Sequence, residues 1–557
     1  MRFCNRLVAA AIFSAFLALY LATPTSNYTF DAVNYGHMIR LSQTSGPLLL
    51  FHPHHILFNC LGLITWKALG ILYPSIDPLT ALQVMNSFIG ALGLAVFFLI
   101  LRRLLADTAP EGSACGPSTA VAAMATAAVG LTFGWWAAST DGRPYIPPIA
   151  AVLGAFYFAY LTARTASGWT AAGMGLMIAI ATLLHQSHAL FLVAGAVAII
   201  ISPTLLREKL RLSLIVIGVF LPVTIIPYTV VFRLRETQTV SEAVNWALTY
   251  ARLGVWWNFD VLGNIDADLS GLRHAFLADI SAKSAYIPFL SALMGHAVIL
   301  FASAFVVLGL LDRTMVHVRH YHPPRPRRVY ILDGVKGGSF GVPPNPLYVF
   351  NILLLVWVVS YSAFFTVWTP GYFVFWIPVA AAWVMILTVN GAARRDRRFT
   401  FGVASLAALC FATANLWLYV LPRMPVESNP SIVIARKIRE NTPPKSLVIV
   451  AGMGYIADME VYIPYFGKRE TISLHQTMLR HGGKGIDRLQ QKIRGELSEG
   501  NRVYVFGEVF DSPKAWQELT KRYGIKRQDV RAALIRFRPV KRFRVSDQPV
   551  YELRGSR

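Results

Sequence analysis

Long runs of apolar residues, separated by short polar segments, dominate the chain up to about residue 420. About eleven of these runs approach the roughly 20 residues that a helix needs to cross a bilayer. They lie near residues 7–23, 79–101, 118–138, 145–163, 170–186, 189–204, 212–232, 287–311, 347–367, 372–391 and 399–420. The pattern therefore predicts a polytopic α-helical membrane protein in which residues 1–421 form the transmembrane domain.

The pattern changes after Pro422, where charged residues become frequent. Short β-rich runs at 447–451, 503–507 and 543–553 alternate with amphipathic helical stretches at 484–498 and 513–523. Strands that alternate with helices at this spacing are typical of a small α/β domain. We therefore expect residues 422–557 to form a second domain outside the membrane.

The charge of the chain indicates which side of the membrane each loop occupies. Only 15% of the 557 residues are charged, yet the formal net charge is +23. Basic clusters fall on one side if each apolar run crosses once, and that side should be cytoplasmic. They are Arg102/Arg103, Arg164, Arg207–Arg211, 313–336 and Arg394–Arg398. This placement favours contact with membrane lipids and argues against nucleic acid as a partner.

The same orientation puts the N-terminus in the cytoplasm and several loops on the outer side. The outer segments are 24–78, 139–144, 233–286, 368–371 and the C-terminal domain. This requires the apolar segment 54–73 to lie on or dip into the outer leaflet. The alternative, in which 54–73 crosses the membrane, would reverse the side of every later cluster.

Two motifs in the first outer loop carry groups capable of chemistry. Asp31 and Tyr35 are four residues apart, and Asp31 could serve catalysis or cap a helix over 32–42. His52, His54 and His55 put three imidazoles within four residues. Such a cluster suits a phosphate or a metal ion, and the alternative is a hydrogen-bonded helix end.

Three further motifs follow in the later outer segments. Asp141-Gly142-Arg143 combines an acid and a base with an Asp-Gly turn signal, so it could act on a ligand or only form a tight turn. His185 and His188 lie at the outer end of a predicted span, where polar helix ends are common. Trp368 precedes Pro370 and Gly371, and a tryptophan there could simply anchor the chain at the interface.

Together these motifs resemble the membrane-embedded GT-C glycosyltransferases, such as the protein O-mannosyltransferases and the lipid A aminoarabinose transferases. The resemblance rests on Asp31-x-x-x-Tyr35, on His52-Pro53 at the start of an apolar helix, on Asp141 and on Trp368-x-Pro370. It covers roughly residues 1–420. The sequence departs from the family pattern where Ala32 replaces the second acid of an Asp-Glu pair and His54 replaces a proline.

The resemblance implies a GT-C fold and a polyprenyl-phosphate-linked sugar donor, used at the outer face of a bacterial inner membrane. Asp31 would be the general base of an inverting transfer to a lipid, glycan or protein. The donor phosphate or the acceptor would contact a set of polar and aromatic residues: Tyr35, His52, His54, Arg143, His185, His188 and Trp368. Asp141 would be the candidate ligand for a divalent Mg²⁺, Mn²⁺ or Zn²⁺ ion, and a metal-free site is an equal alternative.

Two other function classes fit parts of the sequence. A flippase or transporter for a lipid-linked sugar would need ionisable residues at mid-membrane, whereas Arg, Asp and Glu lie almost entirely at the ends of the predicted spans. A catalytically inactive membrane scaffold is the other alternative, because Ala32 stands where the family has a carboxylate.

Overall fold

The structure is a computed structural model that describes residues 2–108, 115–236, 239–254, 256–278, 344–394, 397–452 and 458–555. The span predicted at 287–311 and the basic segment 313–336 lie outside these residues. Contacts divide the chain into two compact units. Unit 1 contains 1–24, 45–76 and 80–422, and unit 2 contains 25–44, 77–79 and 423–557.

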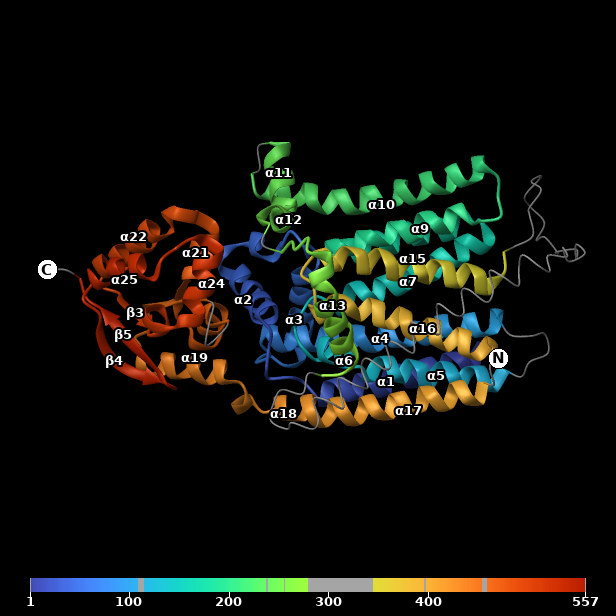
Figure 1. Cartoon of the computed structure of the whole chain (residues 1–557), viewed down its shortest axis with the longest axis horizontal. Coiled ribbons are helices and arrows are strands. Elements are labelled where there is room, and N and C mark those ends of the chain that lie inside the picture. Colours follow the sequence, from blue (N-terminus) through green and yellow to red (C-terminus); the bar gives the residue numbers. More distant parts are fainter. Residues whose placement is uncertain are drawn as a thin grey trace, which may run out of the picture. The chain divides into compact units, whose positions relative to one another are not determined.

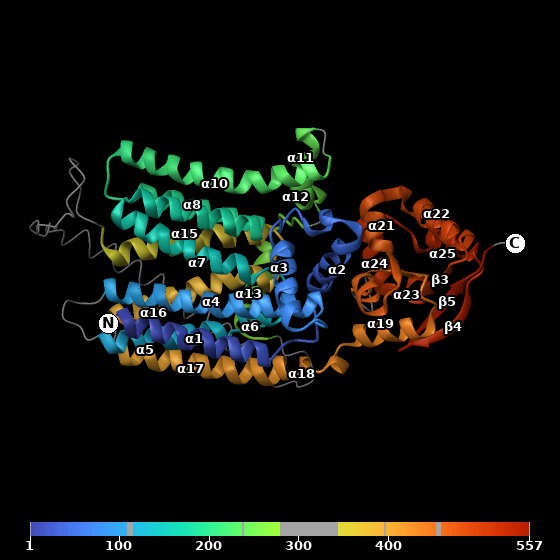
Figure 2. The same ribbon diagram turned by 180° about the vertical axis from the view of Figure 1, so that it is seen from behind.

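Unit 1 is built from helices, and its long helices lie side by side in both views (Figures 1 and 2). In chain order the longer ones are α1 (Arg2–Ala22), α3 (Phe58–Leu72), α4 (Pro78–Asp107), α5 (Cys115–Leu131), α6 (Phe133–Thr140), α7 (Ile146–Thr165), α8 (Gly168–Leu184), α9 (Phe191–Ile200), α10 (Leu206–Leu234), α13 (Val261–Phe276), α15 (Pro346–Val367), α16 (Ile377–Arg394) and α17 (Arg397–Asn415). Shorter elements between and after them are η1 (Pro47–Leu50), η2 (Gln186–Leu190), α11 (Val240–Ala247), α12 (Thr249–Leu253), η3 (Phe373–Trp376), η4 (Leu416–Val420) and α18 (Leu421–Arg423).

The described helices confirm a multi-pass membrane protein. Seven of them are long and apolar enough to cross a bilayer, and an eighth span is possible if a bent pair counts as one. The spans predicted at 170–186 and 189–204 correspond to shorter apolar helices, α8 and η2 with α9. Helix α3 has 15 residues; at a rise of about 1.5 Å per residue it is shorter than a hydrocarbon core of about 30 Å.

The bent pair is the span that the sequence predicts as one run at 118–138. Helices α5 and α6 meet at an angle of 64°. The break falls at Thr132, which has an extended backbone and donates its hydroxyl to the carbonyl of Val129. A run of apolar residues alone does not reveal such a break, because composition is unchanged across it. The bend directs α6 into the turn at 139–144.

Unit 2 contains a five-stranded sheet with the strand order β2-β1-β3-β5-β4. The strands are β1 (Ser446–Val450), β2 (Glu470–Ser473), β3 (Arg502–Phe506), β4 (Val540–Val545) and β5 (Gln548–Leu553). β1 pairs in parallel with β2 and β3, and β5 pairs antiparallel with β3 and β4. The single run predicted at 543–553 is therefore a hairpin, which turns at Ser546 with a φ of 54°.

Helices cover both faces of this sheet because its strand residues alternate between two cores. Val448 and Val450 face one core, with α2 (Phe30–Ser45), α19 (Pro430–Asn441), α20 (Met459–Tyr462) and η6 (Ile463–Gly467). Leu447 and Ile449 face the other, with α21 (Leu474–His481), α22 (Gly485–Ser498), α24 (Pro513–Tyr523) and α25 (Arg527–Ile535). The remaining short helices are η5 (Val426–Ser428), η7 (Gly482–Lys484) and α23 (Glu508–Asp511). The small α/β domain predicted at the C-terminus is therefore present.

The contacts do not separate the chain by a single cut after residue 421. Residues 25–44 pack with the C-terminal segment, because Ala32 and Val33 are fully buried in the same core as α19 and β1. Polar contacts reinforce this attachment. The Tyr462 hydroxyl donates to the Tyr28 carbonyl at 2.6 Å, and the Asn429 amide donates to the Ser26 carbonyl at 2.7 Å. The helix that carries Asp31 is thus part of unit 2.

Candidate functional site

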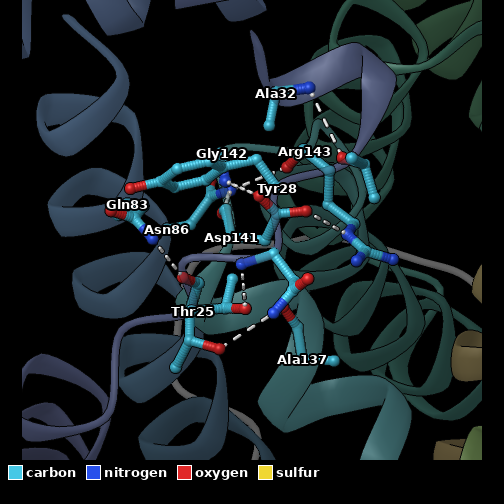
Figure 3. A network of polar contacts seen from close by, with 12 residues as sticks. Thr25, Tyr28, Ala32, Gln83, Asn86, Ala137, Asp141, Gly142 and Arg143 are labelled. Carbon is cyan, nitrogen blue, oxygen red and sulfur yellow. Dashed lines mark hydrogen bonds and ion pairs between the residues drawn. The ribbon is translucent and has the colours of Figure 1, made fainter. Parts of the chain in front are cut away.

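The turn between α6 and α7 in unit 1 holds a buried ion pair. The Arg143 Nε donates to Asp141 Oδ2 at 3.0 Å, and both residues are at most 3% exposed (Figure 3). The other carboxylate oxygen of Asp141 accepts from the Gly142 backbone N–H at 2.8 Å. These contacts give Asp141 a clear structural role, which is to fix the turn and the arginine that follows it.

Three polar side chains of α4, Gln83, Asn86 and Ser87, donate hydrogen bonds to the backbone of this turn, and we call them the α4 stripe. Gln83 donates to the Thr140 carbonyl, and the Asn86 amide donates to the carbonyls of Asp141 and Arg143, both at 2.7 Å (Figure 3). Ser87 donates to the Ser139 carbonyl at 3.0 Å. The spacing of three and four residues puts these side chains on one helical face. A row of polar residues at this spacing inside an apolar span is a signal that the sequence itself carries.

Arg143 has hydrogen-bond donors that the described residues do not use. Its Nε contacts Asp141, whereas its two terminal amino groups have no hydrogen-bond acceptor among the described residues. The guanidinium lies 5.5 Å from the centroid of the Phe373 ring. Burial favours the neutral form, but the carboxylate of Asp141 and the nearby Tyr372 and Tyr419 hold the pKa of Arg143 above its ordinary value. Arg143 is therefore a fixed, permanent cation.

Five histidines form a second cluster in unit 1, which we call the histidine cluster. His52, His54 and His55 come from the loop before α3, and His185 and His188 come from the start of η2. Ring centroids of neighbouring members lie between 4.5 and 6.2 Å apart. The backbone joins the two segments, because Gln186 N donates to the His54 carbonyl at 3.1 Å. The sequence singles out all five histidines as members of two separate motifs. It does not show that the two motifs lie together in the folded protein.

Tyrosines from three other parts of the chain surround the histidine cluster. Tyr250 of α12 lies 4.4 Å from the His54 ring centroid and has its hydroxyl 2.9 Å from His52 Nε2. Tyr145 packs against His185 at 5.6 Å, and the Tyr361 hydroxyl lies 2.8 Å from His188 Nδ1. The sequence carries no pattern that would have singled out these tyrosines.

The histidines differ from Arg143 in charge. Burial lowers the pKa of His54 to about 4, and burial together with the neighbouring His54 lowers the pKa of His52 to about 3. Burial also holds the pKa of His55 well below its ordinary value. At neutral pH these rings are uncharged hydrogen-bonding groups, so Arg143 is the one predicted phosphate ligand that carries a charge in this structure.

Trp368 has a packing role inside the protein. It is 7% exposed and makes an edge contact with Trp257 at 4.7 Å between ring centroids. The backbone around it pairs with the segment before α13, since Asn258 N donates to the Val367 carbonyl and Thr369 N to the Trp256 carbonyl. The His54 ring lies 6.2 Å from Trp368. The interpretation of Trp368 as an interfacial anchor is therefore wrong.

Asp31 and Tyr35 lie in unit 2 on helix α2. The helix begins at Phe30, and the Thr29 hydroxyl accepts from the Ala32 backbone N–H at 3.4 Å. Thr29 thus takes the capping position that the sequence had suggested for Asp31, and Asp31 falls in the first turn. Asp31 is partly exposed and Tyr35 is buried. Their spacing of four residues puts both on one face of α2.

The described residues do not supply the donor set that a metal ion needs. No three His, Cys, Asp or Glu side chains among them are grouped so that they could hold one. Asp141, the predicted metal ligand, is fully buried and uses one oxygen for Gly142 and the other for Arg143. We therefore assign no chemical step to a metal.

Comparison with known proteins gives the fold. No protein-family model matches the chain, and no curated protein matches its sequence. Among solved structures it is similar to ArnT from Cupriavidus metallidurans, a lipid A aminoarabinose transferase, in the form bound to undecaprenyl phosphate, with 13% identity and a TM-score of 0.54 over 100% of this chain and 99% of that one. The apo form of ArnT gives 12% identity and a TM-score of 0.55 over the same shares.

An oligosaccharyltransferase from Archaeoglobus fulgidus also matches, at 12% identity and a TM-score of 0.45, over 96% of this chain and 73% of that one. The likeness to ArnT extends over both compact units, since it covers the whole chain. The chain therefore has the fold of the GT-C membrane glycosyltransferases.

Proposed function

We propose that this protein transfers a sugar from a polyprenyl-phosphate-linked donor to a lipid, glycan or protein acceptor at the outer face of a bacterial inner membrane. The observation that carries the proposal is Arg143, a buried arginine whose terminal amino groups have no acceptor among the described residues. These two amino groups are therefore able to donate to an anionic ligand. A phosphate group would supply the missing acceptors.

Arginine suits this role because its planar fork matches two phosphate oxygens. During transfer, the bond between the anomeric carbon and the phosphate oxygen breaks, and negative charge grows on the departing lipid phosphate. A cation that is already fixed in place stabilises that charge without reorganising. Asp141 and the α4 stripe keep Arg143 fixed, so they act as positioning residues.

Asp31 is our candidate for the general base. It would accept the proton of the acceptor hydroxyl as the hydroxyl oxygen attacks the anomeric carbon from the side opposite the phosphate, which inverts that carbon. Such a base contributes on the order of 10²–10⁴-fold. Ala32 lies fully buried in the apolar core of unit 2. A glutamate there would bury a charge, so we assign the proton transfer to Asp31 alone.

The other predicted contacts divide into two groups. His54 and His185 retain hydrogen-bonding capacity toward a ligand, because the described residues occupy neither ring nitrogen of His54 and only Nδ1 of His185. His52, His188 and Tyr35 remain candidate contacts, and Trp368 supports the loop beside His54. We further propose that the N-terminus is cytoplasmic and that unit 2 is outside, as the basic clusters predict.

Profiling of lipid-linked glycans in a deletion strain tests the function. The strain should accumulate a polyprenyl-phosphate sugar, and the wild-type gene should clear it. Asp31→Asn and Arg143→Lys should fail to clear it while the protein is present in the membrane. Asp266→Asn, an exposed acid on α13, is the matched control and should behave as wild type. A normal glycan profile in the deletion strain, or full complementation by Asp31→Asn, would contradict the proposal.

A further inference from the structure

The hydrogen bonds of the histidine cluster fix which ring nitrogens carry protons. Backbone N–H groups donate to His52 Nδ1 and to His185 Nδ1, both at 3.3 Å, so the single proton of each neutral ring lies on Nε2. His55 is the reverse case. Its Nδ1 lies 3.0 Å from the Leu184 carbonyl oxygen, which can only accept, so Nδ1 carries the proton.

These assignments leave donor capacity at one side of the cluster. The Nε2–H of His185 has no acceptor among the described residues, and neither ring nitrogen of His54 is hydrogen-bonded to them. The two rings lie 6.2 Å apart between centroids. The His185 side chain is 4% exposed, and its Nε2–H remains able to donate to a ligand.

The described groups that shift the pKa of His55 in this cluster are neutral or basic. The titratable side chains that act on the pKa of His55 are His52, His54 and His188, and no carboxylate of the described residues is among them. The other titratable groups that face the rings are the phenols of Tyr145, Tyr250 and Tyr361. The rings therefore remain neutral because burial is uncompensated, and an arriving anion would be the first group to favour a protonated ring.

We propose that the histidine cluster is a proton-linked phosphate site, in which binding of a phosphate anion is coupled to uptake of a proton by His54. The inference rests on the proposed function for the source of that phosphate, which is the donor lipid or the lipid phosphate released from it. A ring that gains a proton donates from both nitrogens, so the cluster changes from a neutral aromatic surface into a cationic one only when a ligand is present.

The direction in which pH changes phosphate affinity follows from a comparison of the phosphate-free and the phosphate-bound cluster. In the empty cluster the pKa of His54, whose two ring nitrogens make no hydrogen bond to the described residues, is about 4. A bound anion raises this pKa. At a pH between the empty and the bound values, binding takes up protons, so affinity rises as pH falls. For one proton the gain is about tenfold per pH unit.

Calorimetry of the full-length protein in detergent micelles tests this inference. Undecaprenyl phosphate is titrated at pH 7.5 in two buffers of different protonation enthalpy, because a phosphate monoester with a second pKa of about 6 is then almost fully ionised. We expect uptake of about one proton per phosphate bound. We also expect roughly tenfold tighter binding at pH 7 than at pH 8. The His54→Gln/His185→Gln variant should lose the uptake, whereas His481→Gln, an exposed histidine of α21, should keep it.

The outcomes separate this inference from the proposed function. Binding of undecaprenyl phosphate without proton uptake, or uptake that survives in the double variant, overturns the inference and leaves the proposed function standing. If inorganic phosphate binds with proton uptake but undecaprenyl phosphate does not bind, the inference stands and the proposed donor is wrong. Failure of both ligands to bind overturns the inference. The wild-type measurement in two buffers decides the matter even if the double variant does not fold.

Discussion

Replacement of Asp141 by asparagine tests whether Arg143 is held as we describe. Asparagine keeps the size of the side chain, and its oxygen can still accept from the Gly142 N–H. Its amide nitrogen cannot accept from Arg143 Nε, so the change removes the ion pair and leaves the turn largely intact. The guanidinium then remains buried without a counter-charge.

The expected loss in the free energy of unfolding can be worked out from the geometry of the ion pair. Two unit charges 3.0 Å apart interact by about 5 kcal/mol at an effective dielectric constant of 20. Measured losses when one partner of a buried pair is removed are about 3–5 kcal/mol. We therefore expect Asp141→Asn to lower the free energy of unfolding by about 3–5 kcal/mol. Removal of both charges in Asp141→Asn/Arg143→Met should cost less than the sum of the single changes, by about 2 kcal/mol or more.

Unfolding of the purified protein in mixed micelles of increasing SDS content, followed by tryptophan fluorescence, measures these differences. Asp266→Asn on the exposed face of α13 is the matched control and should change the midpoint little. Strictly additive single changes, or an Asp141→Asn protein as stable as wild type, would refute the assignment of Asp141 as the group that fixes Arg143.

The same unfolding assay checks three further sites. Asn415→Ala should cost about 2–4 kcal/mol, because this fully buried amide bonds the carbonyls of Leu131 and Phe276 and accepts from Ala278 N; a neutral effect would mean that water replaces it. Gly371→Ala should cost about 1–3 kcal/mol, since its φ is +77° and a Cβ would lie 2.9 Å from the Ala267 carbonyl; unchanged stability would argue against this close approach. Tyr465→Phe should cost about 1 kcal/mol through the lost 2.7 Å bond to Asp77, and an equally stable variant would show that the bond contributes nothing.

The architecture was predictable from the sequence because long apolar runs and alternating β-rich runs report directly on burial. The predicted helix at 513–523 and the start of β1 near 447 agree with α24 and β1 to within a residue. What composition could not reveal is local backbone geometry, such as the 64° bend near Thr132. A bend changes the direction of a helix without changing which residues are apolar.

The site was predictable only as a set of motifs. The sequence pointed to His52, His54, His185 and Arg143, but their partners Tyr250, Tyr361 and Asn86 come from segments with no local signal. Membership of α2 in unit 2 was also hidden, because the contacts of Ala32 and Val33 span some 400 residues of sequence.

The positive charge of the chain is not confined to the loops between the predicted spans. Of the 52 lysines and arginines, 26 lie from Arg423 onward, against 14 of the 29 acids. About half of the excess positive charge therefore belongs to the C-terminal segment of unit 2, which follows the last predicted span. The basic clusters between spans remain the basis for the proposed sidedness.

The central claim is that this GT-C fold transfers sugar from a polyprenyl-phosphate donor, and turnover by the purified protein tests it most directly. Full-length protein in lipid nanodiscs is incubated with the lipid-linked sugar that accumulates in the deletion strain and with membrane extract as the acceptor source. We predict release of polyprenyl phosphate and an inverted glycosidic bond in the product, with both lost in Asp31→Asn and retained in Asp266→Asn. Wild-type protein that binds the donor but releases no polyprenyl phosphate, or moves it across the bilayer intact, would contradict the claim.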